Sequence, residues 1–275
     1  MNPIIAIAAA VVGYLIGAVS FTRIIAKRII PDEDIEETRI EIPGADRPYV
    51  MRSVGASAIL ARKGPKYGLM VTALDMLKGA VPTLIARLLF PEAPYFLITG
   101  VAVIAGHNFP IYYGFKGGAG ISCQWGELLT FSPLGIVATF VGSKILGRLI
   151  IRDIVVSYTS GTLLLIPWMA LRFRGDPAYI SYAVGINILF WASLWADLKL
   201  YVKYVRSGDI QRKVLYEQLS AGHLGSALRR SARRPPASEE ADTSARPSTG
   251  QQTTKPSGTP SSVSNSSSGK EQTHD

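Results

Sequence analysis

Long apolar stretches with almost no charge constrain the fold of this chain most. A helix needs about 20 mostly apolar residues to cross the hydrocarbon core of a bilayer. Pro3–Thr22 and Pro177–Ala196 carry no charge, and Ala93–Phe115 carries none apart from His107. With 48% hydrophobic residues in spite of a very polar C-terminal part, the composition favours a membrane protein over a soluble one.

Four further segments complete the pattern. Ile154–Leu171 is slightly shorter but also free of charge, and Leu69–Phe90 is apolar except for three charged residues. Gly120–Leu149 contains two shorter runs divided at Ser132 and Pro133, because proline disfavours helix at the residue before it. The seven segments predict an all-α integral membrane protein, a bundle of about seven transmembrane helices.

The basic residues predict the orientation of this bundle. The net charge is +9, but the cations lie in short loops rather than on a face that suits nucleic acid, so no nucleic-acid partner is expected. Lys27–Lys66 holds eight of them and Lys199–Arg234 is densely basic, whereas the loop at 91–94 has none. The positive-inside rule then places the N-terminus outside and the C-terminus in the cytoplasm. Arg172 and Arg174 would lie outside and break the rule.

The end of the chain differs from the rest. Residues 1–210 are predicted to form the transmembrane domain, 211–230 a basic cytoplasmic segment, and 231–275 a disordered polar tail rich in Ser, Thr, Pro and Gly. The single cysteine, Cys123, excludes an intrachain disulfide and a multi-cysteine metal site. We expect neither a metal nor a cofactor, and the oligomeric state is left open.

Asp75 and Lys78 are charged residues inside an apolar segment. Their spacing of three places them on one helix face, where they can pair. Intramembrane ionisable groups commonly face the bundle interior or a water-filled cavity. The spacing alone fits a functional pair and a purely structural pair equally well.

A glycine-rich loop follows the third segment. Lys116 precedes glycines at 117, 118 and 120, which can turn several backbone N–H groups toward one point and so suit a phosphate. Glycines also permit a tight turn against neighbouring helices, and on its own the loop favours that structural interpretation. His107 before the loop is similarly open to a substrate contact or to a backbone partner, and no second His or Cys lies at metal-ligand spacing.

The order of three motifs resembles a known family. "YLIGAVSF" in the first segment, "GPKYGLMVTALDMLKGAVP" at 64–82 and "AGHNFPIYYGFKGGAGIS" at 105–122 are similar to the bacterial acyl-phosphate:glycerol-3-phosphate acyltransferases, often called PlsY. The resemblance covers about residues 8–210. It implies a seven-helix bundle in the bacterial inner membrane that transfers an acyl group from acyl phosphate to glycerol 3-phosphate in phosphatidic acid synthesis, with membrane lipids as its surroundings.

The sequence also departs from that family. Its usual "GSGNxGATNxxR" corresponds to "YVMRSVGASAILAR" at 49–62, where Arg62 is the substitute for an arginine one position earlier. Ala119 stands where the family has a lysine in "GGKG", and the "RHREN" near the C-terminal end is missing. An acidic insert at 31–46 lengthens the first loop.

The chemistry implied by the resemblance needs cations and backbone amides. An acyl phosphate is already activated, so no protein nucleophile is required, and the site must hold two anions together. No catalytic residue is assigned. The candidate substrate- and phosphate-binding residues are Arg52, Ser57, Arg62, Lys66, Asp75, Lys78, His107, Lys116, Gly117, Gly118 and Gly120. The alternative is a noncatalytic membrane protein that keeps the fold and binds lipid or a partner.

Overall fold

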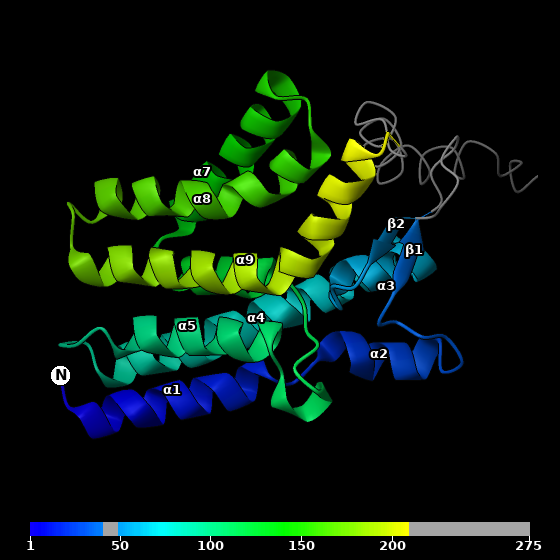
Figure 1. The fold of residues 1–275 in the computed structure, drawn as a ribbon. Coiled ribbons are helices and arrows are strands. Elements are labelled where there is room, and N and C mark those ends of the chain that lie inside the picture. The colour runs from blue at the N-terminus through cyan, green and yellow to red at the C-terminus, as the bar shows by residue number, and fades with distance from the viewer. Residues whose placement is uncertain (41–48, 209–275) are drawn as a thin grey trace, which may run out of the picture. The chain divides into compact units, whose positions relative to one another are not determined.

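The computed structural model describes residues 1–40 and 49–208 as a mainly helical unit (Figure 1). Its α-helices are α1 (Pro3–Gly17), α2 (Phe21–Ile29), α3 (Ala56–Lys63), α4 (Pro65–Leu89), α5 (Tyr95–Asn108), α6 (Ile121–Phe131), α7 (Pro133–Lys144), α8 (Ile154–Arg172) and α9 (Pro177–Arg206). A 3-10 turn at Ile111–Tyr113 and a π-helical segment at Ile145–Ile150 extend α5 and α7. Strands β1 (Thr38–Ile40) and β2 (Tyr49–Met51) pair antiparallel. The predicted segments 211–230 and 231–275, and residues 41–46 of the acidic insert, lie outside the described residues.

Each of the seven predicted segments contains a helix, and the all-α membrane fold is confirmed. In the part of the chain that the structure describes, five helical stretches are long and apolar enough to cross a membrane: Pro3–Ile29, Pro65–Leu89, Tyr95–Tyr113, Pro133–Ile150 and Pro177–Arg206. Helix α8 has 19 residues. Helix α6 has 11 residues and is therefore only about 16 Å long at 1.5 Å per residue. The strand pair is an addition that the sequence did not predict.

Short polar residues set where the helices begin. Asn2, Ser20, Asp153 and Asp176 each accept a hydrogen bond from a backbone N–H in the first turn of the helix they precede, which satisfies donors that have no partner inside a helix. Ser20 matters most for the topology. Its cap starts α2 and separates this amphipathic helix from the apolar α1, so the first predicted segment ends earlier than Thr22.

Glycines let two pairs of helices pack closely. Helix α1 packs against α5, and α4 packs against α6. A Cβ at Gly17 would collide with the backbone of Val103, and one at Gly126 would collide with the carbonyl oxygen of Met76. Without a hydrophobic driving force between helices in lipid, such close backbone contact supplies much of the association.

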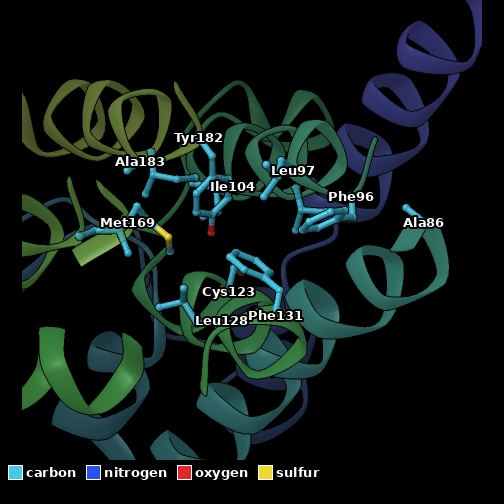
Figure 2. Close-up of a cluster of buried hydrophobic side chains, with 13 residues drawn as sticks. Ala86, Phe96, Leu97, Ile104, Cys123, Leu128, Phe131, Met169, Tyr182 and Ala183 are labelled. Carbon is cyan, nitrogen blue, oxygen red and sulfur yellow. The ribbon is translucent and has the colours of Figure 1, made fainter. Parts of the chain in front are cut away.

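The buried core of the bundle combines aliphatic side chains with a group of aromatic rings (Figure 2). Phe131 lies at its centre, with ring centroids 5.4 Å from Phe96 and 5.5 Å from Tyr182, both in edge-on arrangements. The Tyr182 hydroxyl donates to Oε2 of Glu127 at 2.7 Å, so a fully buried carboxyl group on α6 has one partner. Outside this core, large aliphatic side chains of α1 and α4 stay exposed, Ile4 at 76% and Leu88 at 71%, as expected of a surface that faces lipid.

Candidate phosphate-binding site

The glycine-rich loop runs from the end of α5 to the start of α6. Gly114 and Gly120 have positive φ angles of 61° and 81°, which glycine adopts at little cost. Gly118 N–H donates to the carbonyl oxygen of His107 at 3.2 Å, and Gly117 O accepts from Val54 N–H at 2.9 Å. The loop is therefore held against α5 on one side and against the segment before α3 on the other.

Both central glycines are sterically required. A Cβ at Gly117 would collide with the carbonyl oxygens of His107 and Asn108, and a Cβ at Gly118 would collide with Nε2 of His107. This supports the structural interpretation of the glycines, because their absence of side chains lets the loop pack. It also leaves the N-terminus of α6 at the loop's end, where the first intrahelical bond runs from Gln124 N–H to Gly120 O. The N–H groups of Ile121 and Ser122 precede that bond, as at every helix start.

A buried polar cluster lies beside the loop. The ammonium of Lys78 lies 3.3 Å from Oδ1 of Asp75 and 3.0 Å from Nδ1 of His107, and it donates to Val19 O at 2.8 Å. The side chains of Asp75 and Lys78 are each 2% exposed. Because an ammonium group only donates, Nδ1 accepts and the ring N–H of His107 lies on Nε2, the atom next to Gly118. The cluster thus connects α4, α5 and the α1–α2 junction to the loop.

The same cluster has donor atoms that are near enough to hold a metal. Ligand atoms of Asp75, His107 and Cys123 lie within 4.8 Å of one another. The ammonium of Lys78, within hydrogen-bonding distance of two of these residues, already supplies the positive charge that a metal would bring. The arrangement is therefore best described as a buried lysine site.

Three of the predicted cations, Arg52, Arg62 and Lys116, lie near the acidic segment that follows α2. Nε of Arg62 lies 3.3 Å from Glu33 Oε2, Nε of Arg52 lies 3.6 Å from Glu37 Oε1, and Nζ of Lys116 lies 2.6 Å from Glu36 Oε2. These contacts bring three cations from separate parts of the chain to one segment.

Two other predicted residues lie on neighbouring helices. Ser57 is on α3 and is half-buried. Lys66 is exposed in the first turn of α4, with its ammonium 5.9 Å from the centre of the Tyr67 ring. Within residues 1–40 and 49–208, neither side chain forms a hydrogen bond or an ion pair with the buried cluster or the glycine loop.

Ala119 occupies an apolar position. It is 7% exposed and belongs to a buried cluster with Phe190 and Leu194 of α9. A lysine here would have to bury its charge among apolar side chains, which is costly without a partner. The alanine therefore suits its surroundings in this chain.

Sequence reasoning missed several residues of the site. Arg23 on α2 donates through Nη1 to Lys116 O at 2.8 Å, and its Nη2 lies 3.2 Å from Glu36 Oε1. Asp197 on α9 accepts from the backbone N–H of Arg52 at 3.0 Å. It lies in the region that corresponds to the family's missing "RHREN". Arg23 directly follows the first predicted segment, Pro3–Thr22, and no motif singled it out. The acidic insert was the one available signal, because carboxylates beside a basic site suggest pairing.

Glu36 is held as a carboxylate. The hydrogen bond from Lys116 lowers the pKa of Glu36, burial opposes this, and Arg23 lowers the pKa further by a hydrogen bond and by its charge. A lowered pKa means that these contacts are complete above the ordinary value of 4.5 and are lost only as the pH falls through the lower, folded-state pKa. Glu36 is therefore ionised across the neutral range.

Comparison with known proteins identifies the family of this chain. A family model described as "Glycerol-3-phosphate acyltransferase" matches residues 7–204. The chain belongs to the glycerol-3-phosphate acyltransferase family. The match takes in both retained motifs and the first loop, so the resemblance inferred from the sequence is confirmed.

Curated members and solved structures agree. A glycerol-3-phosphate acyltransferase from Halalkalibacterium halodurans is 33% identical over 189 residues, 66% of this chain and 83% of the relative. One from Aquifex aeolicus is 33% identical over 190 residues, 68% of this chain and 86% of the relative.

Two crystal structures of PlsY, described as an integral membrane glycerol 3-phosphate acyltransferase, share the fold. The glycerol 3-phosphate form matches with a TM-score of 0.59 and 25% identity, over 75% of this chain and 94% of that chain. The lysophosphatidic acid form matches with a TM-score of 0.58 and 26% identity, over 77% and 98%. As a member of this family of enzymes, the chain is an integral membrane protein.

Proposed function

We propose that this protein transfers an acyl group from acyl phosphate to glycerol 3-phosphate at the glycine loop. One observation carries the proposal. The retained "DMLKG" of α4 and the "GHNFP…FKGG" of α5 and its loop meet in space, because Lys78 contacts His107 and His107 contacts the loop through Gly118. Two motifs that are typical of the family thus form one connected unit.

The reaction needs positioning and charge more than a protein nucleophile. The oxygen of a glycerol 3-phosphate hydroxyl forms a bond to the acyl carbonyl carbon, and the bond from that carbon to the phosphate oxygen breaks. The products are an acylglycerol phosphate and inorganic phosphate, which takes up the hydroxyl proton. Both substrates carry phosphate groups, so cations and N–H donors at the site stabilise the bound anions and the charge that develops on them.

The residues divide into two groups in this proposal. Lys116 is exposed at 65% and can reach a substrate phosphate, as can the N–H groups at the start of α6. Asp75, Lys78 and His107 are buried and contact one another, so they act as positioning residues that hold the loop. Arg52, Arg62, Lys66 and Ser57 are proposed as further substrate contacts on the approach to the loop.

We further propose that the protein lies in the bacterial inner membrane with its site on the cytoplasmic side. In Figure 1, α2, α3 and the strand pair lie at one end of the bundle, and the N-terminus and the α8–α9 connection lie at the other end. Helix α2 carries Lys27 and Arg28, and helix α3 carries Arg62 and Lys63, so basic residues lie at that end, which favours the cytoplasm for it.

The proposal is tested by replacing an exposed cation of the loop. Lys116→Ala should lower the rate of acyl transfer on the order of a hundredfold, as loss of a charged donor to developing charge commonly does. The matched control is Lys27→Ala, an exposed cation of α2, which should keep full activity. Equal activities of the two variants would contradict the assignment of the site to this loop.

The noncatalytic alternative has one observation in its favour. The cations Arg52, Arg62 and Lys116 are all paired with carboxylates of the chain itself. A folded protein without turnover on several acyl phosphates, but with binding of glycerol 3-phosphate, would support this alternative.

A further inference from the structure

The acidic segment after α2 reaches the proposed site through Glu36. Its two carboxylate oxygens contact two different cations, Oε1 with Nη2 of Arg23 at 3.2 Å and Oε2 with Nζ of Lys116 at 2.6 Å. The same arginine donates to the carbonyl oxygen of Lys116 at 2.8 Å. Arg23, Glu36 and Lys116 therefore form a closed ring of contacts with a negative group between two positive ones.

Arg23 is the fixed member of this ring. Its side chain is 13% exposed, and its guanidinium carbon lies 4.8 Å from the centre of the Tyr113 ring. A guanidinium that is stacked and hydrogen-bonded to a backbone carbonyl loses little further freedom when it binds an anion. The arginine is thus preorganised whether or not Glu36 is present.

Glu36 is the exchangeable member. Its side chain is 39% exposed, and that of Lys116 is 65% exposed. Ion pairs between groups this exposed are weak and are screened by salt. A phosphate monoester carries more negative charge and more acceptor oxygens than a carboxylate, so it can displace Glu36 from the two cations.

The rest of the segment is anchored beside the site. Arg62 donates through Nη2 to the carbonyl oxygens of Asp34 and Glu37, at 2.8 Å each. The carboxylate of Asp34 accepts from Glu36 N–H at 2.8 Å. These contacts hold the backbone of the segment, so release of the Glu36 side chain does not require the segment to leave.

We infer that Arg23 and Lys116 form a binding position for the singly substituted phosphate group of a substrate, and that Glu36 occupies this position as an internal competitor. The inference rests on the proposed function, because the phosphate would belong to glycerol 3-phosphate or to the acyl phosphate. Arg23 then contributes a cation to a loop that has Ala119 in place of the family's lysine. The carboxylate lowers the apparent affinity for the substrate and keeps the two cations paired when no substrate is bound.

The test compares four forms of the full-length protein in lipid nanodiscs: wild type, Glu36→Gln, Arg23→Gln and the double variant. Calorimetry measures the dissociation constant for glycerol 3-phosphate, and an acyl-transfer assay measures KM for each substrate separately. Glu36→Gln should bind glycerol 3-phosphate about two- to fivefold more tightly, the range expected on removing exposed pairs. Arg23→Gln should bind it more weakly than wild type, and the double variant should lose the gain. The substrate whose KM falls in Glu36→Gln identifies the phosphate that uses the position.

Controls separate a local effect from a general one. Glu92→Gln removes an exposed carboxylate from the α4–α5 connection and should change neither the dissociation constant nor KM. The gain in Glu36→Gln should shrink in 0.5 M NaCl (roughly 4 Å screening length). Glu36→Ala should repeat the result of Glu36→Gln, which excludes a contact made by the new amide.

The outcomes also distinguish this inference from the proposed function. Unchanged or weaker binding by both Glu36 variants would overturn the inference, even if wild type turns over normally. Absence of acyl transfer in wild type would overturn the proposed function, and the calorimetric comparison would still decide whether Glu36 competes for the anion position. A gain that persists in the double variant would overturn the role of Arg23.

Discussion

At the scale of single residues, the buried charges connect the loop to the helices. Lys78 lies within ion-pair distance of Asp75 on α4, hydrogen-bonds with His107 on α5 and donates to the carbonyl oxygen of Val19 in the chain after α1. A charge inside a membrane bundle is tolerated only with such partners. The Asp75–Lys78 pair therefore supports the shape of the glycine loop as well as the local stability of the helices.

Removing the ammonium should destabilise the fold. Lys78→Met leaves the carboxylate of Asp75 buried without its cation, which commonly costs about 3–5 kcal/mol. The double variant Asp75→Asn, Lys78→Met should recover most of that loss. Thermal unfolding in detergent measures both, with Lys66→Met, exposed on the same helix, as the control that should behave as wild type. Equal stability of Lys78→Met and wild type would show that the pair does not hold the fold.

At the scale of elements, glycines permit the close approach of helices α4 and α6. Gly79 and Gly126 lie at the contact between α4 and α6, where a Cβ at either would collide with backbone atoms of the other helix. This contact sets the position of α6, whose N-terminus follows the glycine loop. Packing between the two helices therefore fixes where the site's N–H groups lie.

A single added methyl group should disturb this contact. Gly126→Ala should lower stability by about 1–3 kcal/mol, the usual cost of overpacking, because the colliding atom is the backbone oxygen of Met76. Gly185→Ala on α9 is the matched control, since its Cβ would lie 3.6 Å from Val101 in ordinary contact. Chemical denaturation of the two variants measures the difference. Equal stability of the Gly126→Ala and Gly185→Ala variants would contradict a close contact between α4 and α6 at Gly126.

At the scale of the whole molecule, orientation can be read with one cysteine at a time. Cys123 is the chain's single cysteine and is fully buried, so the unmodified protein should not react with a membrane-impermeant maleimide. Glu92→Cys, in the connection without basic residues, should be labelled in intact cells, and Lys27→Cys should be labelled only after the membrane is opened. The reverse pattern would contradict the proposed orientation.

The sequence predicted most of the bundle because apolar segments and prolines mark helices directly. Pro133 occupies the first turn of α7, where its missing N–H costs nothing, whereas in a helix interior it would break the hydrogen-bond pattern. The end of α1 was missed, because the side-chain cap by Ser20 is a local hydrogen bond that hydropathy does not register. The buried Glu127 was also missed, since its Tyr182 partner is 55 residues away in the chain.

The site was predicted only in part for the same reason. The family resemblance singled out the "DMLKG" and "FKGG" motifs but did not predict their contact, and spacing alone did not decide whether Asp75 and Lys78 were functional. The pairing of Arg23 with Glu36 and Lys116 joins α2, the acidic segment and the glycine loop, and no periodicity encodes such a contact. The roles of the eleven candidate site residues stay predictions until variants are measured.

Product formation by the purified protein tests the central claim most directly. The protein in lipid nanodiscs is given acyl phosphate and labelled glycerol 3-phosphate, and labelled acylglycerol phosphate is measured together with released phosphate. Acyl transfer at the glycine loop predicts equal amounts of the two products in wild type and a strong loss of both in Lys116→Ala. Folded wild-type protein that binds glycerol 3-phosphate but forms neither product with any acyl phosphate would contradict it.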